Sequence, residues 1–161
     1  MYVDIDTMPG SSRIWIYQAS DKMSDALVES VSENARIFIQ SWTAHQADLK
    51  ASFKIYNNLF LVVAVDESYN DASGCSIDKK VHFIKSVEQQ TGLNFFDRMN
   101  VAYLSNDTIK IENMNNFSNL INSGQLNDQT IIFNNLVTNL SEFRESWKTP
   151  ISKSWLMNLI D

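Results

Sequence analysis

Residues 59–76 read LFLVVAVDESYNDASGCS, an apolar run followed by a polar segment. Positions 59–65 are all apolar and rich in β-branched types, which is typical of a strand covered on both faces and is too short to cross a membrane. The polar segment leads into a predicted helix. We therefore expect one buried central strand, around which the rest of the chain packs.

The segment before this strand predicts its partner. Residues 51–56 alternate in character, and the asparagines at 57 and 58 suit a two-residue hairpin turn, because Asn tolerates positive φ better than most residues. Such a turn pairs Phe53 with Val62. The first strand is then half-exposed and the second is fully covered.

This hairpin predicts where reactive side chains gather. Antiparallel pairing places the start of the first strand beside the end of the second. Residues that precede position 51 then meet residues that follow position 65, at one end of the sheet. The candidate ligand-binding residues at this end are His45, Asp48, Asp66, Glu67, Ser73, Gly74, Cys75 and Ser76.

The other elements follow from periodicity and turn signals. A helix is expected from about residue 21 to 42, and a second helix from Ser76, whose hydroxyl caps it, to a stop at Gly92. Strands are expected at 13–18, 99–104 and 108–112 and, as QTIIFNN, within 129–137. Helical spacing occurs at 113–123, 136–147 and 152–160, and Trp155, Leu156 and Leu159 are expected to dock the last of these segments. This order predicts a single α+β domain over residues 1–161, with a mainly antiparallel mixed sheet and helices packed on it; a layered α/β sandwich is the alternative.

The composition excludes several classes of partner. A chain of 161 residues with 44% hydrophobic content fits one core. Its net charge of −6 and pI near 4.8 argue against a nucleic acid or an anionic membrane as the main partner. The first residues resemble no signal peptide, so a cytoplasmic location is expected, in agreement with a single cysteine.

The polar segment matches no common cofactor or metal motif. A P-loop needs two glycines and Lys-Ser/Thr, but only Gly74 is present, so ATP hydrolysis of that kind is not expected. Asp66, Ser68 and Asn70 alternate like calcium ligands, but Asp71 stands where the turn glycine belongs. We therefore predict no metal and no cofactor.

Cys75 raises the question of catalysis. It lies next to a helix N-terminus, where a thiolate is favoured, and with His45 and Asp66 it would supply a nucleophile, a base and an orienting carboxylate. The competing interpretation, which we favour, makes Cys75 a small buried residue, His45 a cap after the first helix, and Asp66 and Glu67 acceptors that organise the loop.

Several segments together resemble a known family. They are the 42–45 and 48–52 segments, the 64–68 and 72–78 segments, Phe95-Phe96-Asp97-Arg98, Phe133-Asn134-Asn135, Trp147, Pro150 and Ser154-Trp155. The chain is similar to a family of short bacterial proteins of the Bacteroidetes type that often bear the label "ABC transporter ATPase". The resemblance implies a stand-alone cytosolic domain; the missing P-loop does not support that label.

The leading hypothesis is a non-catalytic domain that binds a protein partner or a small anionic ligand at the sheet end near Ser73 and Ser76. The alternative is a thiol-dependent hydrolase or transferase that uses Cys75 with His45. A third hypothesis is an obligate homodimer that forms through an apolar face. Trp147 and Trp155 are expected in or beside the core, or in a protein-contact patch if exposed.

Overall fold

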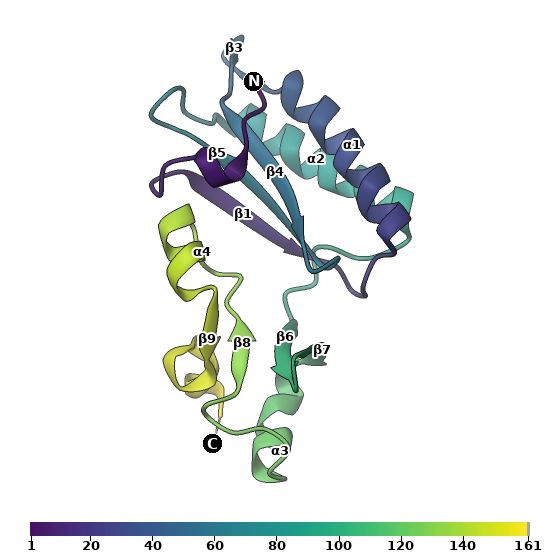
Figure 1. Cartoon of the computed structure of the whole chain (residues 1–161), viewed down its shortest axis with the longest axis vertical. Coiled ribbons are helices and arrows are strands. Elements are labelled where there is room, and N and C mark those ends of the chain that lie inside the picture. Colours follow the sequence, from purple (N-terminus) through teal and green to yellow (C-terminus); the bar gives the residue numbers. More distant parts are fainter. Residues whose placement is uncertain (161) are drawn as a thin grey trace.

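The computed structural model describes residues 1–160, except for the side chain of Leu159. The molecule is elongated (Figure 1): a three-stranded sheet with two long helices forms the upper half, and a four-stranded sheet with short helical segments forms the lower half. The described strands form three sheets, in which all ladders are antiparallel. The predicted α+β class and the mainly antiparallel pairing are confirmed.

The upper sheet is built around the predicted central strand. Its order is β1 (Arg13–Gln18), β5 (Phe60–Val65) and β4 (Ala51–Tyr56), and every residue of β5 is buried. The helices α1 (Asp25–Gln40) and α2 (Gly74–Thr91) cover one face of this sheet (Figure 1). Because β5 is flanked by strands and covered on both faces, its uninterrupted apolar sequence is accounted for.

The predicted hairpin register is wrong by one residue. Phe53 pairs with Val63 instead of Val62, because the loop between β4 and β5 has three residues, 57–59, rather than two. Both asparagines have positive φ, as expected, but Leu59 leaves the ladder: its side chain is buried and its carbonyl accepts the Ala19 N–H. A slip of one residue exchanges the faces of a strand, so the predicted face assignments of β4 are reversed relative to β5.

The corrected register explains how both sheet faces are covered. Phe53 meets Phe83 of α2 on one face, with ring centroids 6.3 Å apart. On the other face, Tyr56 and Phe60 meet Trp147, with ring centroids 5.7 and 4.8 Å apart. The sheet is therefore the middle layer between two helices and the carboxyl-terminal part of the chain.

The lower half contains a second antiparallel sheet. Its order is β7 (Thr108–Asn113), β6 (Asn100–Ser105), β8 (Ile131–Phe133) and β9 (Lys148–Pro150). The strand expected within 129–137 is only three residues long, because a turn follows in which the Leu136 N–H donates to the Asn134 side chain. The remaining elements are η1 (Ile5–Thr7), β2 (Thr43–Ala44), β3 (Ala47–Asp48), η2 (Met114–Asn116), α3 (Phe117–Asn122), α4 (Leu140–Ser146), η3 (Ile151–Lys153) and η4 (Trp155–Leu159).

Two hydrophobic clusters stabilise these halves. The larger one runs from the upper sheet to Trp147, and the smaller one surrounds Phe117 and Ile132 in the lower half. Leu156 docks the carboxyl-terminal segment into the smaller cluster, as predicted, although this segment is 3-10 rather than α-helical. The predicted docking of Leu159 lies outside the described side chains.

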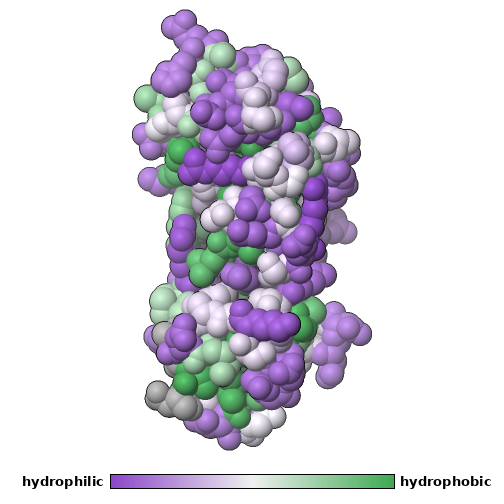
Figure 2. Space-filling view, turned by 90° about the vertical axis from the view of Figure 1, so that its left-hand side faces the viewer, coloured by the Kyte–Doolittle hydropathy of each residue, from purple (hydrophilic) through white to green (hydrophobic). Residues whose placement is uncertain are grey.

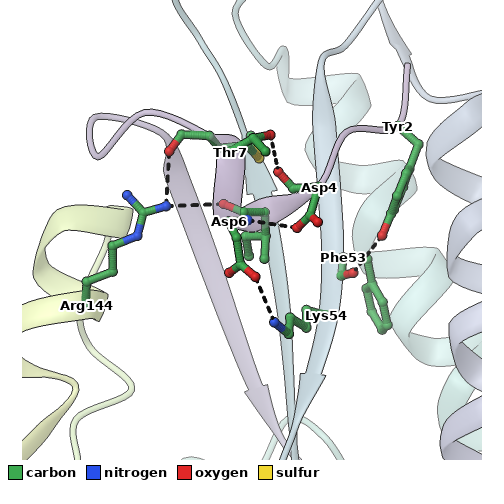
Figure 3. A network of polar contacts seen from close by, with 9 residues as sticks. Tyr2, Asp4, Asp6, Thr7, Phe53, Lys54 and Arg144 are labelled. Carbon is green, nitrogen blue, oxygen red and sulfur yellow. Dashed lines mark hydrogen bonds and ion pairs between the residues drawn. The ribbon is translucent and has the colours of Figure 1, made fainter.

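Arg144 connects helix α4 to the amino-terminal segment of the chain. From α4, its Nη2 donates to the carbonyl oxygens of Ile5 and Met8, at 3.2 and 3.0 Å (Figure 3). In the same network, Lys54 of β4 lies 3.3 Å from Asp6. The amino-terminal turn is thereby held against both the sheet and α4.

Arg144→Ala is expected to lower the free energy of unfolding by about 1–2 kcal/mol, because two partly buried carbonyls lose a charged donor. Urea denaturation followed by circular dichroism measures this change. Glu145→Ala, at an exposed position of the same helix, is the control and should change stability by less than about 0.5 kcal/mol. Equal effects of the two substitutions would contradict the role of Arg144.

Candidate functional site

The predicted meeting of segments at one sheet end is confirmed. The Asp66 N–H donates to the Lys50 carbonyl at 2.9 Å, so the end of β5 lies beside the start of β4. The Asn70 amide lies 3.4 Å from the Ala47 carbonyl and 3.5 Å from those of Ala44 and Asp48. The loop after β5 therefore packs against the hairpin of β2 and β3.

Asp66 and Glu67 organise this loop, as predicted. Asp66 is buried and accepts the N–H and the hydroxyl of Ser68, at 3.1 and 2.5 Å, and it lies 3.3 Å from Lys50. The Ser68 hydroxyl, assisted by Lys50, holds the pKa of Asp66 below its ordinary value. Glu67 accepts the Ala72 N–H at 3.3 Å, so both carboxylates are engaged within the protein.

His45 does not cap the first helix, so that expectation is wrong. Helix α1 already ends at Gln40. His45 lies at the tip of the β2–β3 hairpin, where it and Gln46 have φ values of 51° and 67°, and its side chain is exposed. Asp48, in the same hairpin, is also exposed. No hydrogen bond joins the His45 imidazole to Cys75 or to another residue within 1–160.

The start of α2 differs from the prediction by three residues. The cap is Ser73, whose hydroxyl accepts the Ser76 N–H at 3.1 Å, while the Ser76 hydroxyl accepts the Ser73 N–H at 2.7 Å. Helix α2 therefore begins at Gly74. Each of these two serine hydroxyls accepts the backbone N–H of the other serine, so fewer free N–H groups remain at the N-terminus of α2 for an anion than the sequence predicts.

Cys75 is exposed, so its predicted burial is wrong. The buried face of α2 contains Ser76, Lys80, Ile84 and Val87, which follow helical spacing. Cys75 precedes Ser76 by one position, about 100° away from that face. The Ser76 carbonyl instead accepts the Trp42 indole N–H at 2.9 Å, which fixes the orientation of the helix.

Lys80 is the group that the sequence prediction missed. It is 1% exposed, and its amine lies 3.7 Å from the ring centroid of Trp15 and 5.4 Å from that of Tyr17. No hydrogen bond or ion pair joins this amine to another residue within 1–160. Burial, followed by the charges of Arg13 and Arg98, lowers the pKa of Lys80 from 10.5 to about 7.

A cleft of about 320 Å³ runs along β1 on the side away from β5. Five consecutive residues of β1, from Ile14 to Gln18, line it. Because side chains of a strand alternate between its faces, five consecutive lining residues mean that the cleft follows the edge of the strand. The other walls include Phe95, Phe96, Arg98, Phe133 and Leu136.

Arg98 is the cation among the lining residues of this cleft, and two further cations, Lys80 and Arg13, contact its Trp15 wall without lining it. Lys80 and Arg13 both lie over the Trp15 ring, with the Arg13 guanidinium 4.7 Å from the ring centroid. Arg13 has one carboxylate neighbour, Glu67, at 3.7 Å. Arg98 lies close enough to influence the pKa of both Lys80 and Tyr17, and it has no carboxylate within 4.0 Å in the described chain. The charged residues of the cleft wall are thus Arg98 and Asp97, and the Asp97 carboxylate accepts the Met99 N–H at 2.9 Å and the Asn100 amide at 3.2 Å.

The surface around the cleft is partly apolar. Phe96 and Leu136, which line the cleft, are 38% and 54% exposed. Figure 2, which views the molecule from the left-hand side of Figure 1, shows hydrophobic atoms reaching the surface at mid-height between hydrophilic ones. A larger hollow of about 880 Å³ beside the 57–59 loop is lined by charges of both signs, including Lys22, Asp21 and Asp107, and has no comparable buried cation.

The fold and the cleft define a class: an α+β protein with an aromatic cleft along an edge strand and an arginine, Arg98, on the cleft wall. Comparison with protein-family models, curated proteins and solved structures finds no match to this chain. The resemblance to the Bacteroidetes-type family therefore stays a prediction. None of the described helices is long and apolar enough to cross a membrane, and within residues 1–160 no three His, Cys, Asp or Glu side chains form a group that could hold a metal ion.

Proposed function

We propose that this protein is a non-catalytic binding domain, and that its cleft along β1 binds a ligand with an anionic group next to an apolar part. The observation that carries the proposal is the Arg98 side chain, which lines the aromatic cleft along β1, has no carboxylate within 4.0 Å in the described chain, and lies near the buried Lys80 amine. The proposal keeps the small anionic ligand of the sequence-based hypothesis and moves its site. Arg13 connects the two places, because it begins β1 and contacts Glu67.

An anion at this end would remove an electrostatic cost. Like charges disfavour one another at short range, and burial makes a charged amine more costly. A ligand carboxylate or phosphate bound to Arg98 would offset the repulsion between Arg98 and the nearby Lys80 charge, and would form charge-assisted hydrogen bonds with Arg98. The aromatic walls would cover the apolar part of the ligand, which is the usual composition of a ligand site.

Phenyl phosphate is a suitable probe, because it joins an anion to an aromatic ring. We expect it to shift the NMR signal of the Trp15 indole N–H. We also expect it to bind more tightly than inorganic phosphate, which has only the anion, or benzyl alcohol, which has only the aromatic ring. Arg98→Ala should weaken binding about tenfold, as expected for the loss of a hydrogen bond to a charged group.

Lys85→Ala is the matched control, because Lys85 is exposed on α2 and lies outside the cleft. It should leave the affinity for phenyl phosphate unchanged. Equal binding of phenyl phosphate and benzyl alcohol, or equal effects of the two alanine variants, would contradict an anion site at Arg98.

Thiol chemistry has less support as a function. Cys75 is exposed in the first turn of α2, but it and His45 share no contact with each other or with the cleft. Its alkylation rate as a function of pH tests the alternative: a rate that follows an ordinary thiol titration would leave Cys75 without an assisting base.

A further inference from the structure

The edge of β1 is open over a short stretch between two closed ends. In the upper sheet β1 pairs only with β5. At one end of β1, the Ile14 N–H donates away from β5 to the Thr138 carbonyl at 2.9 Å. Beyond the other end, the Ser20 N–H donates to the Asn94 carbonyl at 2.8 Å. Between these contacts the strand faces the cleft.

The alternation of an antiparallel ladder identifies the free groups. Since Ile14 bonds outward, Trp15 and Tyr17 bond toward β5, and Ile16 and Gln18 direct their backbone groups outward again. Within residues 1–160, the backbone N–H and carbonyl of Ile16 have no backbone partner on that side. Unpaired backbone groups on an edge strand are a template for another strand.

We infer, on the basis of the proposed function, that the ligand is the carboxyl end of an extended peptide, which pairs with β1 at Ile16 and directs its terminal carboxylate to Arg98. The open backbone between Ile14 and Ser20 supplies main-chain hydrogen bonds. Arg98 supplies the charge that a terminal carboxylate complements. This combines strand addition with capture of a carboxylate, two established modes of peptide recognition.

The length of the open stretch of β1 favours the end of a peptide over a longer strand that continues past both ends of the stretch. Residues 16–18 span about 10 Å at the usual rise of a strand, enough for two or three paired residues. Thr138 and Asn94 occupy the edge on either side of this stretch. Phe96 and Leu136 at the rim offer an apolar contact to one ligand side chain.

The test uses the full chain and the peptide acetyl-Ser-Thr-Val-Leu with a free carboxyl end. Titration calorimetry should show binding, and replacing the terminal carboxylate by a carboxamide should weaken it about tenfold or more. Arg98→Gln should remove this preference for the acid, whereas Lys85→Gln should preserve it. Two further peptides carry an N-methyl group on the last or on the second-last amide. Only one of the two should bind more weakly, because successive N–H groups of a strand face opposite sides and only one of them points toward β1.

Hydrogen exchange gives an independent readout of the pairing. In the free protein, the Ile16 amide should exchange much faster than those of Trp15 and Tyr17, and the peptide should slow exchange at Ile16 but not at Ile14. A peptide that binds equally as acid and amide, or without protecting Ile16, would overturn the inference.

Two outcomes separate this inference from the function on which it depends. Binding of phenyl phosphate without binding of the peptide overturns the inference alone, whereas failure of both overturns the anion site as well. Slow exchange of the Ile16 amide in the absence of peptide, together with a dimeric mass by sedimentation, would show that a second copy of the chain occupies the edge of β1. That result would also overturn the inference.

Discussion

Lys80→Met is expected to stabilise the protein by about 2–3 kcal/mol at pH 7, because it removes a charge that the folded protein buries without a carboxylate partner. Methionine has an unbranched stem of similar length and can fill the same space beside Trp15. The contacts of the amine with the Trp15 and Tyr17 rings favour its charged form, by about 0.5–2 kcal/mol, and they offset only part of the burial cost.

The stabilisation should depend on pH in a defined direction. The pKa of Lys80 is about 7 in the folded protein and 10.5 when unperturbed, so the unfolded chain binds more protons between these values. The stability of the wild-type protein therefore rises with pH across this window, relative to a variant without the lysine. We expect the advantage of Lys80→Met to fall to about 1 kcal/mol at pH 9.5.

Urea denaturation at pH 6, 7, 8 and 9.5 measures this difference. Among the charged and titratable groups around Lys80, Arg13 and Arg98 keep their charge throughout this range, and burial raises the pKa of Tyr17 to about 12, above the range. Lys79→Met, at the exposed neighbouring position, is the control and should change stability little at any pH. A Lys80→Met variant that is less stable than the wild-type protein at pH 7 would contradict this account.

Trp147→Ala is expected to lower the free energy of unfolding by about 3–5 kcal/mol, the usual cost of removing a large buried aromatic side chain. Trp147 is 5% exposed and connects the upper sheet to the carboxyl-terminal segment. Its ring centroid lies 4.8 Å from that of Phe60, 4.9 Å from that of Phe133 and 4.6 Å from that of Phe143.

Trp147→Phe separates the packing of this residue from its hydrogen bond. The indole N–H donates to the Asn135 side chain at 3.0 Å, and Asn135 in turn donates to Gln18 at 2.9 Å, on the wall of the cleft. The phenylalanine variant should keep most of the packing and lose about 1–2 kcal/mol. Thermal and urea denaturation compare the variants, and an alanine variant that loses less than about 1 kcal/mol would show that the aromatic cluster is not central to stability.

Part of the site was accessible from the sequence. The meeting of residues around 45–50 with those after 65 follows from antiparallel pairing, and it holds although the register was wrong by one residue. The roles of Asp66 and Glu67 follow from the preference of carboxylates for nearby loop N–H groups. The exposure of Cys75 could not be predicted in this way, because it depends on the rotation of α2 about its axis.

One signal in the sequence pointed to the missed lysine. Lys80, Ile84 and Val87 share one helical stripe, so a lysine occurs among positions that face a core. Ile77 and Val81, each one position after a member of the buried face, are more apolar than Ser76 and Lys80 and favour a slightly rotated face. The cap at Ser73 and the Trp42 indole bond to Ser76 fix the actual rotation, and both become visible only when the helix is docked.

The central run at 59–65 shows what the sequence by itself determined. Its continuous apolar character required a strand covered on both faces, and local signals such as Gly92 marked where elements end, because these properties depend on neighbouring residues. The tertiary structure alone decided the three-residue loop, the exposure of Cys75, the contact of Lys80 with Trp15, and the cleft that Trp15 and Arg98 line. These features join residues far apart in the chain, and the free energy of such contacts arises only after the sheet and helices have packed.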